Sequence, residues 1–153
     1  MKSTYKRVDD LLGMVHRFHK QLAVFYAQLS ENSDRERVQM LLQYMSRHER
    51  NFAQAMAEYD KETADKLLDT WIQYAPDRDV LSIPQAKDLD KNMTVDDVVK
   101  IAMELDEHLA RFYSEAARSV DFSELKDFFC KLQEQEQADK AELARNAEMI
   151  KHY

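Results

Sequence analysis

The chain has 153 residues, a mass of 18.1 kDa and a formal net charge of −7, which suits one domain with a sizeable core. Its basic residues are interspersed with acidic ones, which argues against nucleic acid or an anionic membrane as a partner. A single glycine, Gly13, and a single cysteine, Cys130, exclude glycine-rich phosphate loops, internal disulfides and thiolate zinc clusters. Because no long apolar run or apolar leader segment is present, we expect a cytoplasmic protein.

Apolar residues at helical spacing predict two long helices in the first part of the chain. The first should end near residues 30–32. The second follows Ser33, whose side chain suits the start of a helix, and should extend over about 33–60. The apolar positions are Val8, Leu11, Leu12, Val15, Leu22, Phe25, Tyr26 and Leu29 in the first, and Val38, Leu41, Leu42, Met45, Phe52 and Met56 in the second.

The pattern then becomes irregular. A shorter helix is predicted over 62–74, because apolar residues from Leu67 to Ile72 keep helical spacing and Pro76 ends it. Residues 76–93 contain both prolines and are predicted to form an irregular connection. Two further long helices should follow, one from Thr94, a suitable N-cap, and one from about 121–123.

The two predicted pairs of long helices share a register. Residues 17–30 (RFHKQLAVFYAQLS) and 104–117 (ELDEHLARFYSEAA) align without a gap at an offset of 87, and the register continues into the following helix. We therefore expect an all-α four-helix bundle, duplicated within a single domain over 1–153. Its repeat halves are approximately 4–60 and 94–152, and a long crossover at 61–93, with a short helix in it, joins the two hairpins.

Each long helix carries an ionisable residue on its otherwise apolar face. A carboxylate in a low-dielectric core is costly unless it is paired, protonated or bound to a metal. Carboxylates at one level of a bundle repel one another, whereas a divalent cation would organise them. Oxygen ligands with one imidazole favour iron, manganese or zinc, so we predict a site for one or two such ions. The predicted ligands are His19, Glu49, Asp106, Glu136 and Asp139.

Other roles are open for the same residues. His19 could be a core histidine that is hydrogen-bonded to Asp106 or Glu49 in a buried network without metal, or it could lie on a solvated face. Tyr26 and Tyr113 lie within two turns of the predicted ligands and either hydrogen-bond their carboxylates or fill core volume.

Three other histidines neighbour the core positions. His16, His48 and His108 are turned by about 100° from the adjacent core residue, so we expect them at the surface. The stretch that contains Lys140 and Glu142 is expected to be solvated.

These motifs resemble the rubrerythrin-type proteins of the ferritin-like superfamily. AMELDEHLARFY (102–113) is similar to the helix that precedes each metal-binding half in that family, where a Glu stands seven residues before the Tyr of an FY pair. LQEQEQAD (132–139) is similar to the following helix, which carries Glu-x-x-His, and MSRHERNF (45–52) is its counterpart in the first half. The resemblance covers nearly the whole chain and implies a ferritin-like four-helix bundle.

The chain departs from the family pattern at four of the six ligand positions. Family members with an intact dinuclear site have Glu where this chain has His19 and Asp106, and His where it has Phe52 and Asp139. Phe52 removes one ligand outright, and Asp106 is one methylene shorter than Glu. The resemblance therefore implies an altered site with fewer or weaker ligands than a normal dinuclear centre.

Two functions of different classes follow from these features. The first is a ferritin-like metalloprotein that binds iron, manganese or zinc through the five predicted ligands and reacts with dioxygen or peroxide. The second is a non-catalytic bundle that has lost the site and acts as a binding or scaffold protein, with an interface near Trp71 and Tyr74. In either case we expect a homo-oligomer, namely a dimer.

Overall fold

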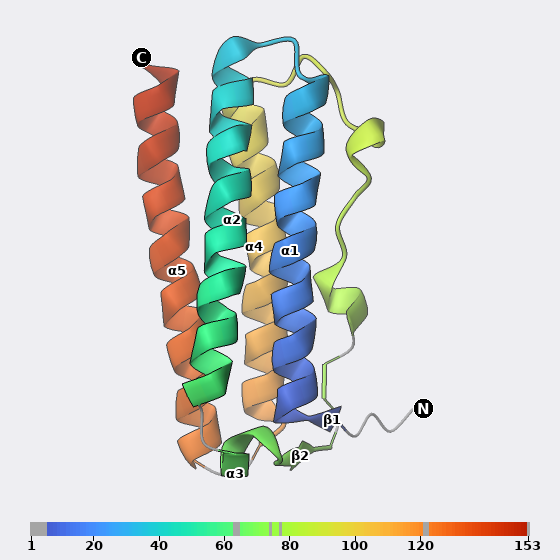
Figure 1. Cartoon of the computed structure of the whole chain (residues 1–153), viewed down its shortest axis with the longest axis vertical. Coiled ribbons are helices and arrows are strands. Elements are labelled where there is room, and N and C mark those ends of the chain that lie inside the picture. The colour runs from blue at the N-terminus through green and yellow to red at the C-terminus, as the bar shows by residue number, and fades with distance from the viewer. Residues whose placement is uncertain (1–5, 63–64, 74, 77, 121–122, 153) are drawn as a thin grey trace.

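Four long helices run side by side in the computed structural model of the chain (Figure 1). The structure describes residues 6–62, 65–73, 75–76, 78–120 and 123–152, with the backbone alone at 56–62 and 78. The long helices are α1 (Val8–Asn32), α2 (Glu36–Glu62), α4 (Val95–Arg118) and α5 (Ser123–Lys151). α1 packs antiparallel to α2, and α4 packs antiparallel to α5. The predicted all-α bundle of two hairpins is confirmed.

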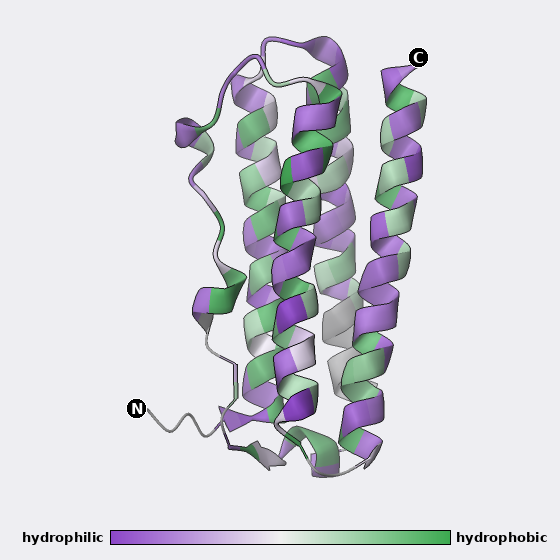
Figure 2. Ribbon diagram, turned by 180° about the vertical axis from the view of Figure 1, so that it is seen from behind, coloured by the Kyte–Doolittle hydropathy of each residue, from purple (hydrophilic) through white to green (hydrophobic). Residues whose placement is uncertain are grey.

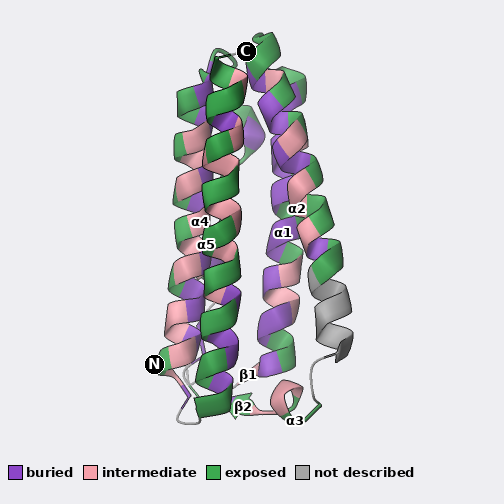
Figure 3. Cartoon of the chain, turned by 90° about the vertical axis from the view of Figure 1, so that its left-hand side faces the viewer, coloured by how far each residue is buried: buried purple, intermediate pink, exposed green. Residues whose placement is uncertain are grey.

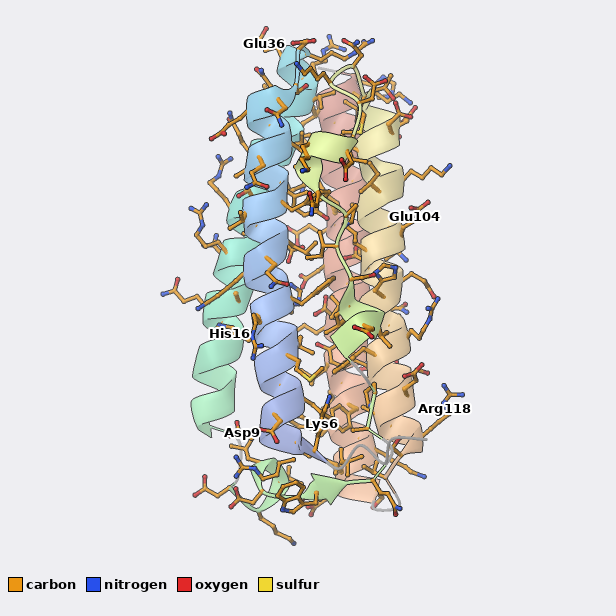
Figure 4. All side chains as sticks on the ribbon, turned by 90° about the vertical axis from the view of Figure 1, so that its right-hand side faces the viewer. Lys6, Asp9, His16, Glu36, Glu104 and Arg118 are labelled. Carbon is orange, nitrogen blue, oxygen red and sulfur yellow. The ribbon has the colours of Figure 1, made fainter. Side chains whose placement is uncertain are left out.

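The helix starts repeat with the spacing found in the sequence. α1 and α4 begin at Val8 and Val95, and α2 and α5 begin at Glu36 and Ser123, so the members of both pairs are 87 residues apart. Figure 4 shows Glu36 at the opposite end of the bundle from Asp9, near the start of α1. The common spacing supports a duplication, and the division into repeat halves stays a prediction.

The two hairpins begin with different N-terminal caps. In α4, the amide of Asp97 donates to Thr94 Oγ1 at 3.1 Å and the amide of Thr94 donates to Asp97 Oδ2 at 2.9 Å. This is a capping box, and Thr94 is confirmed as the N-cap. In α1, the amide of Arg7 donates to Asp10 Oδ2 at 3.1 Å, and the Arg7 side chain makes no cap hydrogen bond.

The crossover contains less helix than the sequence predicts. α3 covers only Asp65–Leu68 and is followed by strand β2 (Trp71–Ile72), so the helix expected over 62–74 is wrong in its second half. β2 pairs antiparallel with strand β1 (Lys6–Arg7). Aromatic and β-branched residues favour strand geometry, and the N-terminal segment supplies a pairing partner that lies far away in the sequence.

Beyond β2 the chain travels back along the outside of α1 to the start of α4 (Figure 1). Two short 3₁₀ helices, η1 (Arg78–Leu81) and η2 (Ala86–Asp88), interrupt this segment. Nδ1 of His108, on α4, lies 3.0 Å from the carbonyl oxygen of Ser82, within hydrogen-bonding distance. The long crossover between the hairpins is therefore confirmed, and part of it is held against α4.

The core lies along the facing stripes of the four long helices. Hydrophobic and hydrophilic residues alternate around each helix (Figure 2), and both FY pairs, 25–26 and 112–113, are buried. Within the described residues, each helix is too short or too polar to span a membrane. Trp71 is exposed, as its predicted interface role requires. Tyr74 and the side chain of Met56 lie outside the described part of the chain.

Candidate metal centre

The five predicted ligands surround one small cavity between the hairpins. Each lies near the middle of its helix, where helical spacing brings one of the predicted ligands from each of α1, α2 and α4, and two from α5, to the same part of the bundle. The cavity has a volume of about 20 Å³. Its lining residues are His19 from α1, His48, Glu49 and Phe52 from α2, Asp106 from α4, and Glu136, Asp139, Lys140 and Leu143 from α5. The structure thus brings all five together, and their role as ligands stays a prediction.

His19 lies between two glutamates that belong to different hairpins. Its Nδ1 is 2.5 Å from Glu49 Oε2, and its Nε2 is 2.8 Å from Glu136 Oε1. The imidazole is 2% exposed, and the two carboxylates are 12% and 11% exposed. Asp106 and Glu49 were the two partners expected for His19 in a buried network. Glu49 is confirmed, and the second partner is Glu136 instead of Asp106.

His19 is the fully buried cation of this cluster. Burial by itself lowers the pKa of its imidazole, but the charges of Glu136 and Glu49, with hydrogen bonds to both, raise that pKa from 6.5 to about 10. At neutral pH both ring N–H groups therefore donate to carboxylate oxygens. A metal needs a nitrogen lone pair, so coordination by His19 would require the loss of a proton and of one glutamate partner.

The two tyrosines of the FY pairs lie against the cluster. The Tyr113 hydroxyl donates to Glu136 Oε1 at 3.4 Å, so this tyrosine contacts a predicted ligand. Tyr26 is 2% exposed, and burial, followed by the charges of Glu49 and Asp106, raises its pKa well above the usual value. Tyr26 therefore stays neutral beside the carboxylates.

Both aspartates in the cavity wall have raised pKa values. Burial, followed by the charges of Glu49 and Glu136, raises the pKa of Asp106 to about 8. Burial raises the pKa of Asp139 to about 6, and the nearby His48 opposes this shift. At neutral pH Asp106 is therefore mostly protonated and Asp139 mostly ionised, which reduces the repulsion among the four carboxyl groups.

His48 also lines the cavity, so its predicted surface position is wrong. Its side chain is 27% exposed, and its Nε2 lies 3.9 Å from Asp139 Oδ1. His48 follows Met45 by three residues and precedes Phe52 by four, and both of these neighbours were assigned to the buried face. That spacing is the sequence signal for His48, because residues three and four apart share a helix face.

Of the other polar residues near the centre of the bundle, some line the cavity and some do not. Lys140 is half-buried and lines the cavity, so the predicted solvated stretch is wrong at Lys140, whereas Glu142 is exposed as predicted. His16 and His108 are also half-buried, but neither is among the lining residues. Glu104 is exposed on α4 and points away from the bundle (Figure 4).

The residues present do not fit a dinuclear metal centre. Two ions in such a centre lie about 3.5–4 Å apart, whereas a cavity of about 20 Å³ has room for one water molecule or one ion. The ring of Phe52, which has no ligand atom, lies in the cavity wall with its centroid 4.5 Å from that of His19. Among the described residues, no group of three or more His, Cys, Asp or Glu side chains is already arranged to hold a metal.

A single ion fits the cavity better. His48 Nε2 and Asp139 Oδ2 are buried and have no hydrogen-bond partner in the described part of the chain. Imidazole nitrogen and carboxylate oxygen are common ligands of iron, manganese and zinc. The volume and the donor chemistry therefore suit one ion, provided that the side chains adjust around it.

Comparison with known proteins agrees with this architecture. The rubrerythrin family model matches residues 20–147. A crystal structure from Thermotoga maritima, described as a ferritin-like diiron-carboxylate protein, is similar with a TM-score of 0.58 and 22% identity, over 94% of this chain and 96% of that chain. At this identity the likeness shows the fold alone. No curated relative matches the sequence. The family match spans most of the chain, from α1 to α5, and the chain therefore belongs to the rubrerythrin family.

Proposed function

We propose that this protein binds one transition-metal ion, of the iron, manganese or zinc type, in the central cavity of the bundle. The observation that carries the proposal is the convergence of imidazole and carboxylate side chains from both hairpins on a cavity with room for a single ion. Membership of the rubrerythrin family supports it. The altered donor set distinguishes the proposed site from a two-ion centre.

The residues around the cavity have separable tasks in this proposal. Glu136 and Asp139 supply negative charge beside the ion, and the hydroxyl of Tyr113 orients Glu136. Phe52 and Leu143 supply the apolar part of the wall and limit the entry of water. When bound, the ion would supply Lewis acidity and, if it is iron, electron exchange with dioxygen or peroxide.

Metal content tests the proposal directly. The protein is purified after growth with iron, manganese or zinc, and bound metal per chain is measured by mass spectrometry. We expect about one ion per chain for the wild type, and a large loss when Glu136→Gln is combined with Asp139→Asn, because these two carboxylates supply the negative charge beside the ion. The matched control combines Glu104→Gln with Glu134→Gln, two exposed carboxylates on α4 and α5. A wild type without metal, unchanged by either pair, would contradict the proposal.

A second function is favoured by the ion pairs of His19. An internal imidazolium that neutralises Glu49 and Glu136 lets the bundle stay folded without metal, as a non-catalytic binding protein requires. The two functions differ in how stability responds to metal. Ligand binding at 100 times the dissociation constant adds about 2.7 kcal/mol to the free energy of unfolding. The metal-free function predicts the same urea midpoint with chelator and with added metal.

A further inference from the structure

Two buried atoms on the α2–α5 side of the cavity lack hydrogen-bond partners. In the part of the chain that the structure describes, the buried side-chain nitrogen and oxygen atoms without a hydrogen-bond partner are His48 Nε2 and Asp139 Oδ2. An unsatisfied buried polar group costs about 1–3 kcal/mol, so two such atoms in neighbouring side chains require an explanation. A species bound between the two side chains would satisfy both atoms.

The distance between the two side chains suits a shared ligand. His48 Nε2 is 3.9 Å from Asp139 Oδ1, which belongs to the same carboxylate as the unpartnered Oδ2, and this distance is too long for a hydrogen bond. Two donors at about 2.1 Å from a tetrahedral metal lie about 3.4 Å apart. An adjustment of roughly half an ångström would therefore bring His48 Nε2 and one oxygen of the Asp139 carboxylate into coordinating geometry.

The alternative imidazole is already engaged. Both ring nitrogens of His19 are bonded to glutamates, and the imidazole is 2% exposed among its partners. His48 lies on α2 four residues before Phe52, so the two side chains share a helix face, and both line the cavity. An imidazole from the same helix therefore remains available where the side chain at position 52 is apolar.

The structure assigns His48 and Asp139 as the two protein ligands of a single metal ion on the α2–α5 side of the cavity. Water completes the coordination, in keeping with the lack of a three-residue ligand group among the described residues. His19 remains the internal cation that holds Glu49 and Glu136 together. This inference rests on the proposed function, because it names the ligands of the proposed ion.

Titration with Co²⁺ tests the assignment. The full chain, stripped of metal with a chelator, is titrated while visible ligand-field absorption reports the binding constant. Proton NMR of the same samples reports the exchangeable imidazole N–H of a coordinating histidine through its paramagnetic shift. His48→Gln and Asp139→Asn should each weaken Co²⁺ binding at least about tenfold, and His48→Gln should remove the shifted N–H signal.

His108→Gln is the matched control, since His108 is also half-buried but lies outside the cavity wall. It should leave Co²⁺ affinity and the NMR signal unchanged, and circular dichroism should show that all three variants stay folded. If the wild type binds Co²⁺ and His48→Gln binds it equally well, the assignment fails while the proposed function stands. If the wild type binds no Co²⁺, both fail.

Discussion

The polar centre is enclosed more tightly beside α1 than beside α5. α1 buries twelve of its residues, whereas the longer α5 buries five. None of those five lies between Leu132 and Ala147, where α5 lines the cavity, and the outward face of α5 is largely exposed (Figure 3). The centre is therefore tightly packed around His19 and looser beside His48 and Asp139. A fully buried side of the centre needs a permanent internal cation, while a looser side can accept an exchangeable ion.

Removal of the buried cation should have the largest effect. His19→Leu leaves Glu49 and Glu136 as buried carboxylates without their partner, and loss of one member of a buried pair costs about 3–5 kcal/mol. Urea unfolding in the presence of a chelator measures this loss. His108→Leu, which removes a half-buried imidazole outside the cavity, should cost much less. Equal stability of His19→Leu and wild type would show that the ion pairs do not hold the tight side together.

The next largest difference should come from truncating one leucine on α1 and one on α5. Leu22 on α1 is 0% exposed, and Leu22→Ala should lower the free energy of unfolding by about 2–5 kcal/mol, because it opens a void in a packed core. Leu143 on α5 is only half-buried, so Leu143→Ala should cost less than about 2 kcal/mol. The same urea experiment compares the two variants, and equal costs would remove the contrast between α1 and α5.

The pH dependence of stability should follow the raised pKa values of the centre. The folded state raises the pKa of His19 from 6.5 to about 10, so the stabilisation from its charged form is complete below pH 6.5 and is lost as the pH rises through about 10. The folded state also raises the pKa of Asp106 from 3.8 to about 8. The stabilisation that the neutral form of Asp106 provides is therefore complete below pH 3.8 and is lost as the pH rises through about 8. Both changes make the protein less stable as the pH rises.

The urea midpoint measured across this range checks the sign. It should fall between pH 6.5 and about 10. Asp106→Asn should make the fall of the midpoint below about pH 8 less steep and leave the fall above pH 8, which is due to His19, unchanged. A midpoint that rises between pH 6.5 and about 8 would mean that neither group is held in its protonated form.

The smallest difference between the hairpins should lie in their caps. Thr94→Ala removes the hydroxyl that accepts from Asp97 at the start of α4 and should cost about 1 kcal/mol. Arg7→Ala should cost less at the start of α1, because the Arg7 side chain makes no cap hydrogen bond. Thermal unfolding of the two variants compares them, and a larger loss for Arg7→Ala would reverse this expectation.

Much of the candidate site could be predicted from the sequence. Ionisable residues such as His19 and Glu136 interrupt apolar stripes, and helical spacing places each of them on the inner face of its own helix. His48 escaped the prediction, because its neighbour Glu49 was taken as the centre of the buried face. The face of α2 that lines the cavity is wide enough to include both His48 and Glu49. Its width depends on how closely α5 packs against α2.

The sequence by itself determined the four long helices, their two hairpins and the level of the polar centre. These features depend on local spacing, on the scarcity of glycine and on the positions of Pro76 and Pro84. Only the tertiary structure decided that His19 lies between Glu49 and Glu136, and that β2 pairs with the N-terminal strand. Helical spacing fixes the direction of a side chain around its own axis, whereas its partners depend on how separate segments are rotated and packed against one another.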